Sequence, residues 1–151
     1  MTLEQDIEFL KMMTFDSIDE MNNNTIIQKY FDVKFDGTGA IEHIFKGFYD
    51  SMHYLNGYHS ECLYPNLYGI DEHKNIIMNK PYELKLNAKK LEPNTFFPLT
   101  MSSSDVLVAI LLAYKRIENK VTSVIYLNEY NFKIKICISY NGKIFDAYPD
   151  I

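Results

Sequence analysis

Two short stretches of the chain carry the residue types that most often do chemistry. The first holds His43, Lys46, Asp50 and His53, which share one face if the segment is helical. Asp50 and His53 could bind a metal ion together, because residues three apart on a helix are neighbours. The stretch lacks the paired histidines of the common zinc-protease motif and a third acid nearby. A solvated helix face with a Glu42–Lys46 ion pair explains the same residues, so we predict no metal site.

The second stretch holds His59 and Cys62, with Glu61 between them. A catalytic thiolate needs a base within hydrogen-bond reach and electropositive surroundings, and closeness in sequence provides neither. Cys137, on an expected strand, is no better placed. The chain also lacks a glycine-rich phosphate loop, a G-x-S-x-G turn and a C-x-x-C pair. We therefore predict no catalytic residue and no cofactor.

Helices are expected mainly in the first half of the chain. Thr2 and Gln5 form a capping-box pattern before apolar residues at helical spacing, which predicts a helix over residues 3–13. Residues 41–55 carry a continuous apolar stripe, which predicts a long amphipathic helix. Three further helices are expected: residues 15–21, residues 26–31 after a cap at Thr25, and the apolar residues 106–117 after caps between 102 and 105.

The period changes from helical to alternating after residue 119. Residues 121–127 and 132–138 are rich in β-branched and aromatic residues, and the second run alternates strictly, so we expect two antiparallel strands. Asn141 and Gly142 predict a tight hairpin to a third strand at residues 143–145, with positive φ at both turn residues. Two more strands are expected earlier, over residues 76–78 and 82–88.

Length and composition limit the fold and the compartment. With 151 residues, 47% of them apolar and 23% charged, the chain has the size and mixture of one globular domain. Helices first and strands last predict a single α+β domain over residues 1–151, its N-terminal helices and central apolar helix packed on a C-terminal antiparallel sheet. No apolar run reaches the length of a membrane span, and the acidic start does not fit a signal peptide. We expect a cytoplasmic protein with Cys62 and Cys137 reduced.

The charge of the chain argues against nucleic acid as a direct partner. The chain carries 20 acidic and 15 basic side chains, and Arg116 is its single arginine. Nucleic-acid-binding proteins gain affinity from clustered bases that neutralise phosphates. The acids concentrate at the start, where residues 1–61 hold 11 acids and 4 bases. An acidic surface of this kind steers association with a basic protein, although it also simply keeps a protein soluble.

Tyrosines strengthen the expectation of a protein partner. The chain has 12 tyrosines and no tryptophan. Tyrosine is enriched at interfaces because it offers a large contact area and a polar tip, although tyrosines at the rim of the core, or an AT-rich genome, explain the same number. We predict a partner-binding surface composed of acids and tyrosines: Asp16, Asp19, Glu20, Tyr58, Glu61, Tyr64, Tyr68, Asp71 and Glu72.

In size, acidity and tyrosine content, and in the missing catalytic motif, the chain resembles bacterial immunity proteins of contact-dependent growth inhibition. The resemblance implies a small cytoplasmic inhibitor, monomeric or weakly dimeric, that binds a cognate protein toxin, often a basic nuclease, and occludes its active site. Two alternatives stay open. One is an enzyme whose site is assembled from scattered residues, with these candidates: His43, Asp50, His53, His59 and Cys62. The other is a homo-oligomeric module with the apolar helix at a subunit contact.

Overall fold

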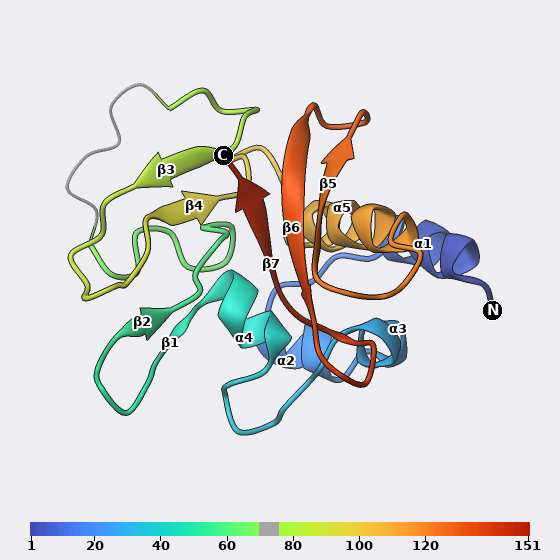
Figure 1. Cartoon of the computed structure of the whole chain (residues 1–151), viewed down its shortest axis with the longest axis horizontal. Helices are drawn as coiled ribbons and strands as arrows, with labels where there is room; N and C mark the ends of the chain where they lie inside the picture. The colour runs from blue at the N-terminus through green and yellow to red at the C-terminus, as the bar shows by residue number, and fades with distance from the viewer. Residues whose placement is uncertain (70–75) are drawn as a thin grey trace.

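The computed structural model describes residues 1–69 and 76–151, in which helices pack against small antiparallel sheets (Figure 1). This arrangement confirms the predicted α+β class. The helices are α1 (Leu3–Lys11), α2 (Ile18–Asn22), α3 (Thr25–Tyr30), α4 (Ala40–Phe45) and α5 (Ser103–Lys115). The strands are β1 (Phe48–Tyr49), β2 (Leu55–Asn56), β3 (Tyr82–Leu84), β4 (Asn94–Phe96), β5 (Ser123–Leu127), β6 (Phe132–Ile138) and β7 (Ile144–Asp150).

The larger of two hydrophobic cores lies between α5 and the sheet of β5, β6 and β7. α5 begins with a capping box, in which Ser102 and Asp105 satisfy each other's backbone amides. Its apolar side chains are buried on almost every side, as the sequence predicts for a central helix. Because these side chains pack within the chain, they do not form a subunit contact. No helix within residues 1–69 or 76–151 is long and apolar enough to cross a lipid bilayer.

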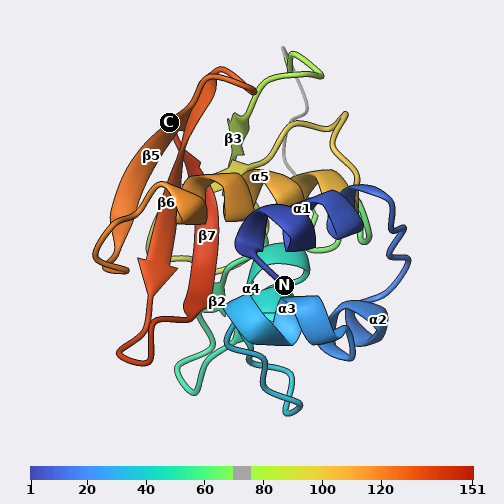
Figure 2. The same ribbon diagram turned by 90° about the vertical axis from the view of Figure 1, so that its right-hand side faces the viewer.

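α1 lies along the side of α5 that faces away from the sheet, while α2 and α3 lie near α4 (Figure 2). α1 packs on α5, and the fully buried Asp6 of α1 accepts hydrogen bonds from Lys29 at 2.7 Å and from Tyr30, both in α3. These bonds tie α1 to α3. The α3 helix is capped by Asn24, whose side chain accepts from two backbone amides, and not by Thr25 as expected.

The prediction of a long amphipathic helix over residues 41–55 is wrong. α4 ends at Phe45, and the chain turns at Gly47, whose φ of 73° belongs to the left-handed region that ends helices. β1 and β2 then form a hairpin, in which the Asp50 carboxylate accepts the backbone amides of Met52 and Tyr54. The turn chemistry of one aspartate and one glycine overrides an apolar periodicity that continues beyond them.

A smaller core lies beneath the two-stranded sheet of β3 and β4. It holds Tyr58, Leu84 and Phe96. β3 confirms the first half of the strand expected over residues 82–88, whereas residues 76–78 form no strand and β4 was not expected. Tyr58 is completely buried, and its hydroxyl donates to the Tyr64 carbonyl at 2.5 Å.

β7 is longer than the sequence pattern indicates. It runs for seven residues and pairs with β6 along its length, so the chain stays extended well past the expected end at residue 145. The hairpin before it differs from the expected one, because Gly142 has a φ of 81° while Asn141 is not among the residues with positive φ. A single left-handed glycine is typical of a three-residue loop with a bulge.

Candidate active site

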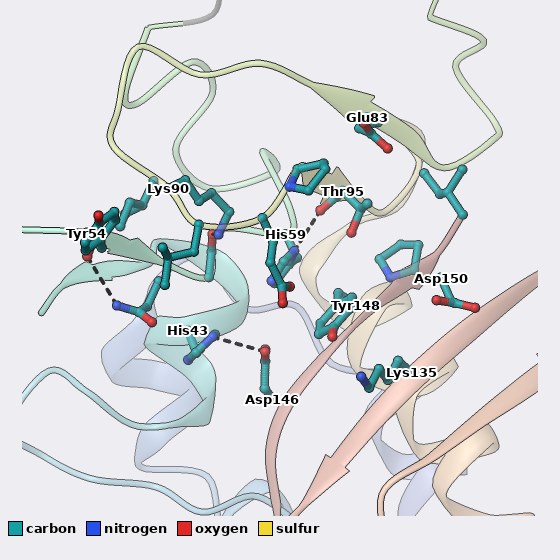
Figure 3. Close-up of a pocket in the computed structure, with 18 residues that line it drawn as sticks. His43, Tyr54, His59, Glu83, Lys90, Thr95, Lys135, Asp146, Tyr148 and Asp150 are labelled. Atoms are coloured by element: carbon teal, nitrogen blue, oxygen red, sulfur yellow. Dashed lines mark hydrogen bonds and ion pairs between the residues drawn. The ribbon is translucent and has the colours of Figure 1, made fainter.

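A cavity of about 500 Å³ opens where β7, the segment that follows β2 and residues 90–95 meet (Figure 3). Five polar side chains in its lining come from four separate parts of the sequence: His43, His59, Lys90, Asp146 and Tyr148. His43 belongs to α4, and Asp146 and Tyr148 belong to β7.

The end of α4 brings the two histidines together. Its last carbonyls need partners outside the helix, and the backbone amides of Tyr58 and His59 donate to the carbonyls of His43 and Ile44, each at 2.7 Å. Gly57 makes this approach feasible, because a Cβ there would lie 2.0 Å from the His43 carbonyl oxygen. The rings of His43 and His59 stand nearly parallel with centroids 6.3 Å apart.

His43 is oriented by a buried carboxylate. Its Nε2 lies 3.1 Å from Oδ2 of Asp146, and because an ionised carboxylate only accepts hydrogen bonds, this nitrogen carries a hydrogen. Burial by itself opposes ionisation of Asp146, yet the hydrogen bond from His43 and the nearby His59 hold the pKa of this carboxyl below its usual value. The backbone amide of Ala147 donates to Asp146 as well, at 2.9 Å.

His59 occupies a different environment. Its side chain is buried, and its Nδ1 lies 2.7 Å from the carbonyl oxygen of Thr95, so Nδ1 carries the hydrogen and Nε2 holds a free electron pair. Burial lowers the pKa of His59 to about 4, which leaves the ring neutral at pH 7. The ring stacks on Tyr148 with a centroid distance of 4.8 Å.

Two lysines contribute positive charge to the cavity. Lys90 donates from Nζ to the Gly57 carbonyl at 3.1 Å, and burial lowers its pKa while the nearby Asp146 carboxylate raises it. Lys135 extends over the Tyr148 ring, with Nζ 5.9 Å from the ring centroid. The cavity therefore combines two imidazoles and two ammonium groups with the buried carboxylate of Asp146. Three further acids also line it: Glu83, Glu92 and Asp150.

This set of groups can transfer protons beside an anionic substrate. One imidazole is neutral with a free electron pair, and the other is held by a carboxylate that would balance a positive charge on it. One ring nitrogen of each histidine and one oxygen of Asp146 also lie within 4.8 Å of one another, which is close enough to hold a divalent metal ion. Both kinds of chemistry fit a site that acts on phosphate esters.

Of the five residues named for the alternative of an enzyme, the structure brings two into the cavity. His43 and His59 meet there, although their separation of 16 residues suggested no connection. Asp50 serves the β1–β2 turn, and His53 is exposed in that turn with a φ of 64°. Cys62 lies on another surface and lines a smaller cavity with Pro65 and Met101.

The residues predicted to bind a protein partner do not share one kind of position. Asp16, Asp19 and Glu20 are exposed near α2, and their contact with a partner stays a prediction. Tyr58 and Glu61 are buried, and Glu61 accepts from the Tyr82 hydroxyl at 2.6 Å. Tyr64 and Tyr68 are half-buried, and the Tyr68 hydroxyl donates to the Lys46 carbonyl at 2.5 Å. Asp71 and Glu72 lie outside the described residues.

Sequence reasoning missed Lys90, Asp146 and Tyr148. The one available signal was the alternation that continues past residue 145, since Asp146 and Tyr148 are two apart and extend the strand pattern of residues 143–145. Lys90 lies in an irregular segment after β3, where no periodicity marks it.

An acid–base enzyme acting on a charged substrate is therefore the class that this fold and cavity define. The family comparison makes that class specific: residues 37–151 match the model of the bacterial EndoU nucleases, and the chain belongs to this family. The matched segment begins just before α4 and contains every residue of the cavity, whereas α1, α2 and α3 precede it. No curated protein and no solved structure matches the chain.

Membership in a nuclease family overturns the main functional prediction from the sequence. The chain is not the toxin-neutralising immunity protein that its acidity and tyrosines indicated, and the expectation of a protein without enzymatic activity is wrong. The resemblance to contact-dependent growth inhibition rested on whole-chain properties, which are shared by many unrelated proteins. Of the alternatives, the enzyme with a site assembled from scattered residues fits the family and the cavity.

Proposed function

We propose that the chain is an endonuclease that cleaves RNA by transferring the scissile phosphate to the neighbouring 2′-hydroxyl. One observation carries the proposal: His43 and His59 open onto the same cavity, and His43 donates a ring N–H to a carboxylate whereas His59 donates one to a neutral backbone carbonyl. Cleavage by internal transfer needs a base and an acid near one phosphate and takes its nucleophile from the substrate. Only RNA supplies that nucleophile, because DNA lacks the 2′-hydroxyl.

His59 is the general base in this mechanism. The Thr95 carbonyl fixes the tautomer in which Nε2 is free, and burial keeps the ring neutral over the physiological pH range. A neutral imidazole accepts the proton of the 2′-hydroxyl as that oxygen attacks phosphorus. Stacking on Tyr148 and the bond to Thr95 hold the plane of the ring.

His43 is the general acid. As the phosphorus–O5′ bond breaks, the leaving 5′-oxygen takes a proton from the His43 imidazolium, whose charge the Asp146 carboxylate balances. The products are a 2′,3′-cyclic phosphate and a 5′-hydroxyl. His59 then carries one proton more and His43 one fewer, and exchange with water restores both histidines.

Lys90 stabilises the charge that develops on the phosphate. Its ammonium group is close enough to Asp146 and His59 for electrostatic interaction with both. An ammonium group held in a partly buried site stabilises a dianionic transition state more than it stabilises the monoanionic substrate.

A metal-dependent hydrolase is the second candidate, favoured by the spacing of His43, His59 and Asp146. Two histidines and one acid are a common ligand set for catalytic zinc. A metal ion there would displace the hydrogen bond between His43 and Asp146, and its charge would repel the neighbouring Lys90 ammonium. These two contacts favour the acid–base proposal.

One experiment distinguishes the candidates. The purified chain is incubated with an RNA oligonucleotide and with a copy that contains a single 2′-deoxynucleotide at the cleaved position, in the presence and absence of EDTA. The proposal expects cleavage of the RNA alone, insensitivity to EDTA and a cyclic phosphate product detected by mass spectrometry. Cleavage of the deoxy substrate, or loss of activity in EDTA that zinc restores, would establish the metal-dependent mechanism instead.

A further inference from the structure

We propose that the open face of the C-terminal sheet binds the RNA strand on one side of the scissile phosphate. The open sheet face consists of Val124, Tyr126, Lys133, Lys135, Tyr148 and Asp150. The inference rests on the proposed function, because it gives the RNA that enters the cavity a path across the protein surface.

Strand register places these six side chains on one surface. Val124 pairs with Lys135, which pairs with Tyr148, and Tyr126 pairs with Lys133 in the neighbouring row. Successive strand residues point to opposite faces, so residues two apart share a face. The intervening residues Ile125, Ile134 and Ile136 point toward α5 and belong to, or pack against, the larger core.

The open sheet face is exposed to solvent in the folded chain. Figures 1 and 2 show α1 and α5 on one side of the sheet, and within residues 1–69 and 76–151 no helix lies over the other side of β5 and β6. Val124 is 45% exposed and Tyr126 is 48% exposed. A flat sheet surface that carries an exposed aromatic ring offers a stacking platform for a nucleic-acid base.

The open sheet face continues directly into the cavity. Lys135, Tyr148 and Asp150 line the cavity and also belong to this face (Figure 3). Val124, Tyr126 and Lys133 are not part of the cavity lining. A strand whose phosphate lies between His43 and His59 would therefore pass Tyr148 and Lys135 before it reaches the outer row of Tyr126 and Lys133.

The charge of the open sheet face fits a polyanion. Lys133 and Lys135 are the two charged residues of β6 and lie about 7 Å apart on one face, since each strand residue adds about 3.3 Å. That separation is close to the distance between successive phosphates in an extended strand. One acid belongs to the face: Asp150 pairs with Lys133 at the end of β7, so the two lysines leave the face one net positive charge. Glu92 is close enough to Lys135 to interact electrostatically.

Substrate length provides the test. The double variant Tyr126→Ala/Lys133→Glu changes only residues outside the cavity, and Tyr140→Ala/Lys80→Glu is the matched control, because Tyr140 and Lys80 are exposed and lie off the open sheet face. Steady-state cleavage is measured on an RNA dinucleotide, which fills the cavity alone, and on a ten-nucleotide RNA.

The proposal expects the double variant to raise KM for the ten-nucleotide RNA about tenfold or more, since one stacked base and one neutralised phosphate are lost. We expect unchanged kcat, unchanged dinucleotide cleavage and a wild-type melting temperature. Binding of a 2′-O-methyl ten-nucleotide RNA, measured by anisotropy, should lose about one unit of salt dependence. An unchanged KM for the long RNA, or equal losses on both substrates, would overturn the inference. If the wild-type chain cleaves neither RNA, the proposed function itself fails.

Discussion

The two sides of the cavity are held by different amounts of structure. His43, Asp146 and Tyr148 lie on α4 and β7, which pack against the larger core. Lys90 belongs to an irregular segment beside the small β3–β4 sheet, whose core is formed by few residues. His43 and Asp146 thus have a fixed geometry, while Lys90 lies on the less extensively packed part of the molecule.

His59 connects these two sides. Its backbone amide donates to Ile44 of α4, and its backbone carbonyl accepts from Phe97 just after β4, both at 2.7 Å. Its ring bonds to Thr95 of β4 and stacks on Tyr148 of β7. The comparison indicates that proton transfer depends on the junction of the two sides, whereas stabilisation of charge by Lys90 depends on the smaller side.

Loss of the base should have the largest effect. His59→Asn removes the free Nε2 and should lower kcat/KM by about 10²–10⁴-fold. His53→Asn is the matched control, because His53 is exposed outside the cavity and asparagine tolerates its positive φ. Rates are measured on the RNA dinucleotide, with circular dichroism to confirm folding. Equal rates for both variants would remove His59 from the mechanism.

Lys90 tests the smaller side by itself. Lys90→Met keeps the aliphatic stem and removes the charge, so we expect kcat to fall by about 10²–10³-fold with little change in KM. Lys89→Met is the control, since Lys89 is exposed and its Nζ lies over Tyr54 at 4.2 Å from the ring centroid. A rise in KM with unchanged kcat would mean that Lys90 binds substrate without stabilising the transition state.

Asp146 tests the better-packed side. Asp146→Asn retains the shape of the side chain but no longer balances charge on His43, so kcat should fall by about 10–100-fold, the cost of one charge-assisted hydrogen bond. The exposed Asp19, in α2 and outside the cavity, provides the control Asp19→Asn. If Asp146→Asn abolished a zinc requirement rather than slowing a metal-independent reaction, the second candidate mechanism would be supported.

The sequence predicts best the parts of the fold that short-range periodicity determines. β6 has the expected bounds, and α5 is the expected apolar helix, because each pattern is contained within the element itself. The cavity could not be predicted in this way. His43 and His59 meet through backbone bonds at the end of a helix that the sequence pattern extends too far, and Asp146 is a charged residue that a strand buries.

The whole-chain charge is a second reason why the site escaped prediction. Acids outnumber bases most strongly in residues 1–61, while Lys90, Lys133 and Lys135 lie in later segments. The net charge of the chain sums side chains that lie far apart. At physiological ionic strength, dissolved ions screen the interaction between exposed charges beyond about 8 Å, so distant acids have little effect on the cavity. The interaction with a bound phosphate is therefore determined by the few lysines near it and not by the net charge of the chain.

The smallest expected effect concerns stability and tests whether His59 is neutral in the folded state. Its pKa of about 4 lies below the ordinary value near 6.5, so between these pH values the unfolded chain binds a proton that the native chain does not. Stability should therefore fall as pH drops from 7.5 to 5, by about 2 kcal/mol from this residue. Asp146 adds little in this range, because its pKa lies below its ordinary acidic value.

Urea unfolding of the wild type and of His59→Asn at both pH values isolates the contribution of His59. We expect the variant to lose less stability than the wild type between pH 7.5 and 5, because asparagine does not titrate. Equal losses would show that His59 is protonated in the folded chain at pH 5. His59 would then keep an ordinary pKa near 6.5, and cleavage should decline progressively below about pH 6.5 instead of persisting to pH 5.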